Sequence, residues 1–225
     1  MSYNWDYLDE KAYNNKVGRY KFRRQFNFIT ENANENFDSI LDIAGGSGRL
    51  AIPLCDYSNK ITVIDLNQDA LDLLSIREQR IRLINNDFNS LEISEKFSLI
   101  ICIEAIGYFD DWKMFFDKIS TIITENGRFI FTYTNPLSWR FYLRRIKHLK
   151  TGCHSYNEMK LNDLRKLLDK TGFEIMKMEG MNWIPFPLAS NSKLVTFFES
   201  FEKVFKLGYW ISQSPWILIS IKKKN

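Results

Sequence analysis

Hydrophobic and polar positions follow two alternating patterns along the 225-residue chain. Short apolar runs predict strands at residues 37–44, 60–66, 80–87, 97–104, 127–134, 173–180 and 214–223. Stretches with apolar residues at helical spacing predict helices at residues 16–32, 49–56, 68–78, 112–123 and 161–170. Gly172 follows the last of these helices and is expected to end it. Strands that alternate with helices favour an α/β fold with a doubly wound, mostly parallel sheet and helices on both faces.

Three segments extend beyond the minimal strand–helix alternation. Residues 1–36 are expected to form a helical lead-in, and residues 136–157 and 183–210 are interpreted as insertions that cap the binding side of a single domain. The second insertion contains an apolar stripe at helical spacing, from Leu194 to Phe205. We expect this stripe, within residues 192–207, to pack on the sheet or the cap, and contact with a second copy of the chain is the alternative.

A glycine-rich turn follows the first predicted strand, in the segment LDIAGGSGRL. Glycines let the backbone approach a ligand closely and adopt positive φ angles. The next strand ends in Asp65, which lies 19 positions after Gly46, where a carboxylate can accept the hydroxyls of a ribose. The sequence therefore predicts a nucleotide-like ligand. Gly46, Gly48 and Ala51 also fit a dinucleotide fingerprint, so an NAD(P)-dependent oxidoreductase is an alternative.

Composition narrows the class of partner. The formal net charge of +4 is too small to indicate a nucleic-acid-binding protein. The three cysteines form no C-x-x-C pair, and neither a metal site nor a disulfide framework is expected. No run approaches the roughly 18 apolar residues of a membrane span. A cytoplasmic location is the expectation.

Several segments in order resemble the class I S-adenosylmethionine-dependent methyltransferases. They are LDIAGGSGRL, VIDLN, NNDF, FSLIICIEAIGYFDD, ITENGRFIFTYTNP and YNEMKLNDLRKLLDKTGFEI, and they cover residues 37–178 together with the last strand. The resemblance implies the strand order 3-2-1-4-5-7-6, with the seventh strand antiparallel, and S-adenosylmethionine as cofactor. Ala44 departs from the family pattern, in which a glycine is more usual.

The resemblance also implies roles for individual residues. The methionine part of the cofactor would be held by backbone groups of Ala44, Gly45, Gly46 and Gly48, with Asp42 beneath it. The nucleoside part would contact Asp65 through its ribose, and Leu66, Asp87 and Phe88 through its adenine. Ile103 and Glu104 would line the pocket near the amino-acid end.

Methyl transfer to a hydroxyl needs a group that removes the proton. His154 is the first candidate because its segment follows the fifth strand, and Glu104 is the second, while a structural role for His154 is the alternative. Tyr108, Arg140, Arg144 and Arg145 are candidates for binding the acceptor, and the arginines favour an anionic one. The expected acceptor is a small molecule such as a sugar, a sugar nucleotide or another specialised metabolite. A non-catalytic S-adenosylmethionine-binding protein is a further alternative.

Overall fold

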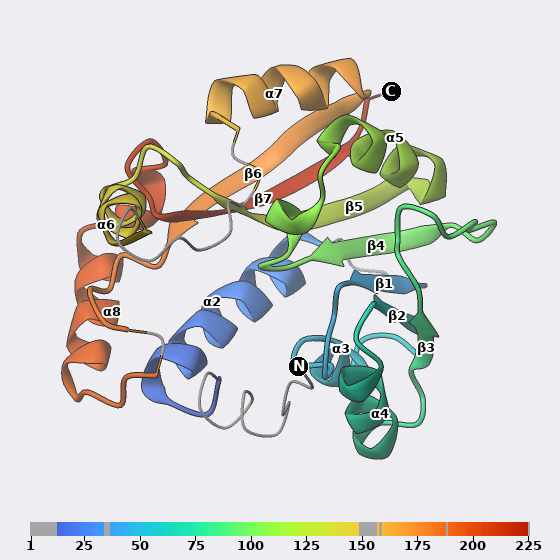
Figure 1. Cartoon of the computed structure of the whole chain (residues 1–225), viewed down its shortest axis with the longest axis horizontal. Helices are drawn as coiled ribbons and strands as arrows, with labels where there is room; N and C mark the ends of the chain where they lie inside the picture. Colours follow the sequence, from blue (N-terminus) through green and yellow to red (C-terminus); the bar gives the residue numbers. More distant parts are fainter. Residues whose placement is uncertain (1–12, 34–36, 149–156, 158, 188, 225) are drawn as a thin grey trace.

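The computed structural model describes residues 13–33, 37–148, 157, 159–187 and 189–224, apart from the side chains of residues 144–148. Within these residues the centre of the molecule is a seven-stranded sheet (Figure 1). The strands are β1 (Ile40–Ile43), β2 (Ile61–Asp65), β3 (Arg82–Asn85), β4 (Phe97–Cys102), β5 (Ile123–Thr134), β6 (Phe173–Met181) and β7 (Trp216–Lys223). Their order is β3-β2-β1-β4-β5-β7-β6, and β7 runs antiparallel to both β5 and β6. The predicted fold class and strand order are confirmed.

Helices cover both faces of this sheet. They are α2 (Lys16–Asn32), α3 (Ala51–Leu54), α4 (Gln68–Arg77), α5 (Trp112–Ile122), α6 (Trp139–His148), α7 (Leu161–Lys170) and α8 (Leu194–Val204), with 3-10 turns η2 (Ile106–Tyr108) and η3 (Leu207–Tyr209). One hydrophobic core joins α5 and α7 to the sheet, and a second joins α2, α3 and α4 to its other face. Consecutive strand residues point to opposite faces, so Ile40 belongs to one core and Leu41 to the other. Among the described residues, no helix combines the length and apolar character that crossing a bilayer requires.

Two elements differ from the predicted boundaries. The helix expected at residues 49–56 is the four-residue α3, and Pro53 lies in its first turn, where a missing amide hydrogen is tolerated. Tight turns follow instead, in which the Cys55 amide donates to the Ile52 carbonyl at 3.0 Å. The other element, β5, begins at Ile123, directly after α5, because the buried Ile123 already pairs with Phe97 of β4. A register shift between Phe97 and Leu99 accommodates the residues that the sequence pattern assigned to a turn.

The apolar stripe of α8 does not pack as expected. Leu194, Phe197, Val204 and Phe205 are each more than half exposed, while Phe198 is partly buried. The side of the helix that faces the protein carries Val195, Glu199 and Glu202 instead. The two carboxylates hold the helix in this orientation, because Glu199 bonds Arg23 at 2.6 Å and Glu202 accepts the hydroxyl of Tyr20 at 2.6 Å. Polar contacts to α2 therefore decide which side of α8 faces inward.

Candidate active site

The glycine-rich turn after β1 adopts a backbone that glycine favours. Ala44, Gly46 and Gly48 have φ angles of 56°, 55° and 82°. A Cβ atom on Gly45 would lie 2.7 Å from Asp42 Oδ2 and 2.9 Å from Val63 Cγ1, so the turn lies tightly against β1 and β2. Ala44 therefore adopts a left-handed backbone conformation, which is sterically unfavourable for alanine, at a position where the related family usually has glycine.

Asp65 is fixed at the carboxyl end of β2, next to the glycine-rich turn. Its Oδ2 accepts the Gly46 amide and its Oδ1 accepts the Asn67 amide, both at 2.8 Å. Each carboxylate oxygen has a second lone pair, so two further donors can bind. Leu66 follows and is 72% exposed, which leaves an apolar surface beside this carboxylate.

The loop after β3 is built in a similar way. Asp87 Oδ1 accepts the Asn89 amide at 2.9 Å, and the Phe88 ring is buried against Phe109 and Phe115. Lys118 of α5 donates to the carbonyls of Phe88, Asn89 and Leu91 and so ties this loop to the helix. No sequence pattern predicted this role of Lys118.

Asp42 is a buried carboxyl under the glycine-rich turn. Burial raises its pKa to about 8; Asp65 adds to this effect and Arg49 opposes it. Ile103, at the end of β4, is also buried. The region predicted to hold the methionine part of the cofactor therefore contains a carboxyl group that favours a nearby positive charge.

Glu104 forms the centre of a buried polar cluster. It has a positive φ of 62°, which side chains larger than glycine rarely adopt. Its carboxylate accepts Lys21 Nζ at 2.7 Å and Gln25 Nε2 at 2.8 Å, and Arg49 Nη2 lies 3.4 Å away. Lys21 and Gln25 lie one helical turn apart on α2, so both reach the same carboxylate.

Burial and charge act in opposite directions on Glu104. Burial raises its pKa, but the charges of Lys21 and Arg49, with the hydrogen bonds from Lys21 and Gln25, outweigh burial and leave the pKa below its usual value. Burial also lowers the pKa of Lys21, although Glu104 opposes this. Lys21 therefore gives up its proton more readily than a solvent-exposed lysine.

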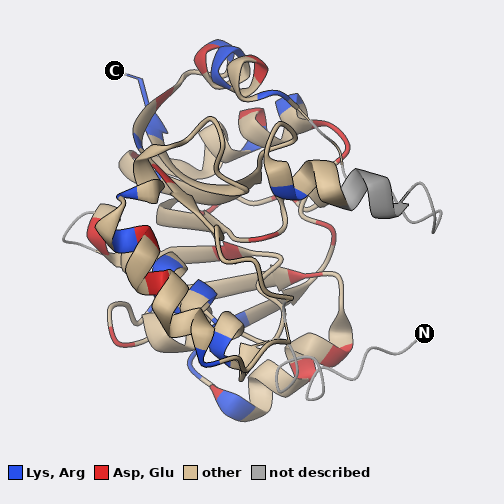
Figure 2. Ribbon diagram, turned by 90° about the vertical axis from the view of Figure 1, so that its left-hand side faces the viewer, with Lys and Arg blue, Asp and Glu red and all other residues tan. Residues whose placement is uncertain are grey.

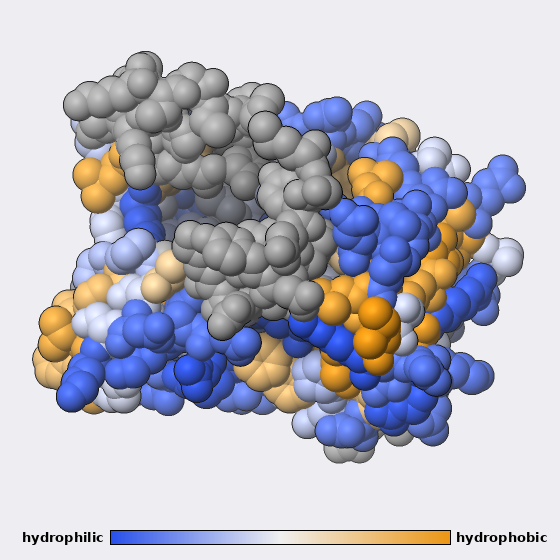
Figure 3. Space-filling view, turned by 60° about the horizontal axis from the view of Figure 1, so that its bottom comes forward, coloured by the Kyte–Doolittle hydropathy of each residue, from blue (hydrophilic) through white to orange (hydrophobic). Residues whose placement is uncertain are grey.

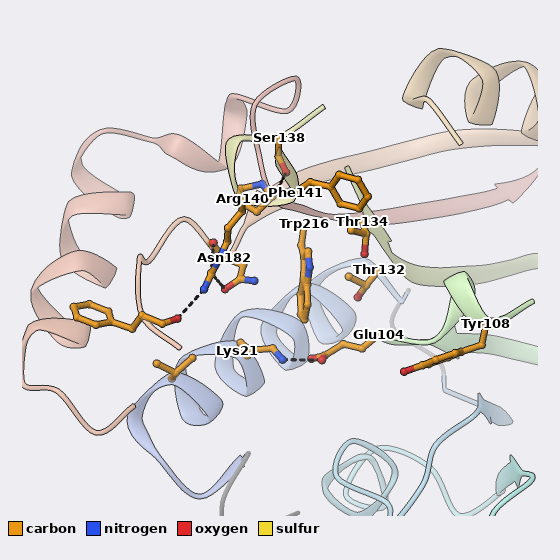
Figure 4. Close-up of a pocket in the computed structure, with 13 residues that line it drawn as sticks. Lys21, Glu104, Tyr108, Thr132, Thr134, Ser138, Arg140, Phe141, Asn182 and Trp216 are labelled. Carbon is orange, nitrogen blue, oxygen red and sulfur yellow. Dashed lines mark hydrogen bonds and ion pairs between the residues drawn. The ribbon is translucent and has the colours of Figure 1, made fainter. Parts of the chain in front are cut away.

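A cavity of about 390 Å³ opens beside this cluster, at the carboxyl ends of β4 and β5 (Figure 4). Lys21 and Glu104 lie on one side of it and α6 on another, and the indole of Trp216 stands between them, with Lys21 Nζ 4.3 Å from the indole centroid. Thr132 lines the cavity, and its buried hydroxyl has no hydrogen-bond partner among the described residues. A buried unpaired hydroxyl in a cavity wall indicates a place for a polar ligand atom.

The structure brings some predicted acceptor residues to this cavity. Glu104 and Arg140 line it, and Tyr108, which is 68% exposed, lies at its edge. Arg140 donates to the Asn182 carbonyl at 3.0 Å and to the Phe186 carbonyl at 2.7 Å, so it fastens the segment after β6. That task was not predicted, and anion binding by Arg140 stays a prediction.

Some predicted residues cannot be placed relative to the cavity. His154 lies outside the described residues, as do the side chains of Arg144 and Arg145. Sequence reasoning also missed residues that line the cavity, namely Lys21, Thr132, Asn182 and Trp216. One signal for Lys21 was present, because Val17, Lys21, Gln25 and Phe28 fall on one face of the predicted helix, and polar residues on an apolar face indicate a buried polar cluster.

The fold and the site together define a class I S-adenosylmethionine-dependent methyltransferase. A sequence model for a family described as "Methyltransferase domain" matches residues 15–177, and the chain belongs to this family. The ubiquinone biosynthesis O-methyltransferase of Rickettsia akari (strain Hartford) is 23% identical over 199 residues, which cover 82% of this chain and 79% of that protein. The family match and the antiparallel β7 decide against the oxidoreductase alternative.

Solved structures of low sequence identity share the fold. A methyltransferase from Thermotoga maritima, described as a possible histamine N-methyltransferase, has a TM-score of 0.69 at 15% identity, with 98% of this chain and 94% of that chain covered. The magnesium protoporphyrin IX methyltransferase of Synechocystis PCC 6803, solved with bound SAH, has a TM-score of 0.64 at 14% identity, with 97% and 87% covered. The descriptions of these proteins name different acceptors, so the fold alone does not name the acceptor of this chain.

Proposed function

We propose that this methyltransferase transfers the methyl group of S-adenosylmethionine to a hydroxyl group of a small molecule that binds in the cavity beside Glu104. The main support is the buried pair of Lys21 and Glu104 in the cavity wall, next to the unpaired hydroxyl of Thr132. A relative with the printed name O-methyltransferase adds support for oxygen as the methylated atom. The cavity lies at the carboxyl ends of the strands, where open α/β sheets bind ligands.

The glycine-rich turn and its neighbours fit the cofactor. The absence of a side chain at Gly45 lets the turn pack closely on β1 and β2, and a positively charged methionine end would favour the ionised form of the buried Asp42 carboxyl. Asp65 has further lone pairs that can accept the ribose hydroxyls. The exposed Leu66 would pack on the adenine, and Asp87 and the Phe88 amide would bind the edge of the adenine. The bound cofactor supplies a methyl group that is already activated by its sulfonium.

Lys21 is the group that would remove the hydroxyl proton. Its lowered pKa makes the neutral amine more accessible near neutral pH. As the acceptor oxygen is methylated, Lys21 Nζ would accept its proton. The ammonium so formed is stabilised by Glu104 at 2.7 Å. Thr132 would orient the acceptor oxygen by a hydrogen bond.

The walls of the cavity favour an acceptor that carries a ring. Trp216, Phe141 and Phe186 contribute aromatic surface, and Thr134 and Ser138 add hydroxyls around it. Aromatic walls bind the flat face of a phenol or of a sugar ring. The cap segments 136–157 and 183–210 would close this side, since Arg140 of the first bonds Phe186 of the second. We propose a cytoplasmic location for this enzyme, as the sequence analysis expected.

The test is a screen of phenols, sugars and sugar nucleotides, followed by kinetics of variants with the acceptor that reacts. Loss of a general base lowers turnover by about 10²–10⁴-fold, so Lys21→Met should lose that factor with little change in affinity for S-adenosylhomocysteine. Lys21→Arg, which keeps the charge but holds its proton, should not restore turnover. His154→Ala is the matched comparison. If it loses turnover while Lys21→Met keeps it, His154 is the base and our assignment of Lys21 is wrong.

A further inference from the structure

The outer side of α8 is apolar although the helix lies on the surface. The five residues Leu194, Phe197, Phe201, Val204 and Phe205 form what we name the α8 apolar face, and their exposed fractions run from 39% to 75%. Tyr209 and Trp210, which are 81% and 61% exposed, extend it through η3. Figure 3 shows apolar side chains along the left-hand edge of the molecule, the side on which Figure 1 places α8. Contiguous exposed apolar surface of this kind marks an interaction site.

The charges around the α8 apolar face are of one sign. Between residues 182 and 213 the sequence contains Lys193, Lys203 and Lys206 as cations and only Glu199 and Glu202 as anions. Both carboxylates face the protein and are mostly buried, and Lys203 pairs with one of them, Glu199, at 3.9 Å. Lys193 and Lys206, before and after the helix, are exposed. Figure 2 shows the charged residues from this side of the molecule. The outer side of α8 therefore offers apolar and cationic groups together.

The combination of apolar side chains and lysines distinguishes between a second copy of the chain and a lipid surface as the partner of this face. In a symmetric dimer through α8, the lysines of one copy would approach those of the other, without a carboxylate on the face to pair with them. An anionic lipid surface satisfies both features, because its acyl region takes the apolar side chains and its headgroups pair with the lysines. Tyrosine and tryptophan, as found in η3, favour the membrane–water interface.

We propose that α8 and η3 dock this methyltransferase on the surface of an anionic phospholipid membrane. The α8 apolar face enters the headgroup–acyl boundary, and Lys193 and Lys206, at the two ends of α8, lie at the headgroups. The inward carboxylates keep α8 in this orientation before the membrane is met. Phe198 of α8 packs against Phe186 of the cavity wall, with ring centroids 5.5 Å apart, so docking brings the cavity beside the lipid.

The experiment is sedimentation of the full-length protein with phosphatidylcholine vesicles that contain or lack phosphatidylglycerol. We expect binding to the anionic vesicles that weakens as salt rises. Phe197→Ser combined with Val204→Ser should lower the partition coefficient by at least about tenfold. Lys193→Gln and Lys206→Gln should each lower it about fivefold. The matched controls are Ile76→Ser on α4, where the residue is 79% exposed, and Lys166→Gln on α7, where it is 73% exposed, and both should bind like the parent.

Two results would overturn the proposal. One is absence of binding to anionic vesicles, or binding that the α8 variants leave unchanged. The other is a dimer, detected by light scattering in the absence of lipid, that the Phe197→Ser and Val204→Ser pair converts to a monomer, because a second copy would then occupy the face. Thermal unfolding of each variant verifies that the fold is intact, and turnover is not needed for either result.

Discussion

Removing the charge of Glu104 is expected to destabilise the fold more than any surface ion pair does. In Glu104→Gln the ammonium of Lys21, which is 1% exposed, loses its anionic partner at 2.7 Å. Breaking a buried pair on one side costs about 3–5 kcal/mol. Arg49 also loses this partner, but it still donates to Gln25 at 2.9 Å and its side chain is partly exposed. At about 2–4 °C for each kcal/mol, the melting temperature should fall by roughly 6–20 °C.

The loss of stability in Glu104→Gln is limited, and depends on pH, because Lys21 can release its proton. A lysine can escape an unfavourable site by releasing its proton, and its ordinary pKa is about 10.4. That release costs about 5 kcal/mol at pH 7 and about 2 kcal/mol at pH 9, since one pKa unit is worth about 1.4 kcal/mol. The destabilisation by Glu104→Gln should therefore shrink as pH rises from 7 to 9.

Urea denaturation of the protein without ligand, at pH 7 and pH 9, measures this effect. The double variant Lys21→Met and Glu104→Gln should recover most of the stability, because no unpaired ammonium remains. Asp117→Asn is the control, since its pair with Lys113 is exposed to solvent and contributes little to stability. A Glu104→Gln variant within about 1 kcal/mol of the parent, or one whose loss neither shrinks at pH 9 nor recovers with Lys21→Met, would refute the reasoning.

Two further predictions concern the cofactor half of the site. Asp65→Ala should weaken binding of S-adenosylhomocysteine at least about tenfold in calorimetry, because a charged hydrogen bond contributes about 1.5–3 kcal/mol. Asp72→Ala on α4 is the control. An unchanged affinity of Asp65→Ala would mean that the ribose binds elsewhere. The carboxyl of Asp42 has a pKa of about 8, raised mainly by burial, so the folded state holds a proton that the unfolded state releases near pH 4. The contribution of this carboxyl to the free energy of unfolding is greatest below about pH 4. It decreases by about 1.4 kcal/mol for each pH unit as the pH rises to about 8. Asp42→Asn should lack this slope when denaturation midpoints are compared at pH 5 and pH 8, and equal slopes in both proteins would contradict the raised pKa.

The order of strands and helices was predictable from sequence because it depends on local patterns. Apolar runs of strand length and helical stripes recur in the order that builds a doubly wound sheet, and the antiparallel β7 followed from the family resemblance. The glycine-rich turn and Asp65 could be placed for the same reason, because both come directly after a strand. Parallel strands bring their carboxyl ends to one edge of the sheet, so residues in those positions must lie near one another.

The tertiary structure alone decided which residues line the cavity beside Glu104. Lys21 and Glu104 are 83 positions apart, and nothing in either local segment says that α2 crosses the end of β4 at the level of Glu104. The orientation of α8 could not be predicted from local sequence either, because periodicity identifies an apolar stripe but not what packs against it. Hydrogen bonds from Arg23 and Tyr20 of α2 turn the carboxylates of α8 inward and leave the stripe outside. Local sequence fixes the period of a helix, whereas the side that is buried depends on partners from distant parts of the chain.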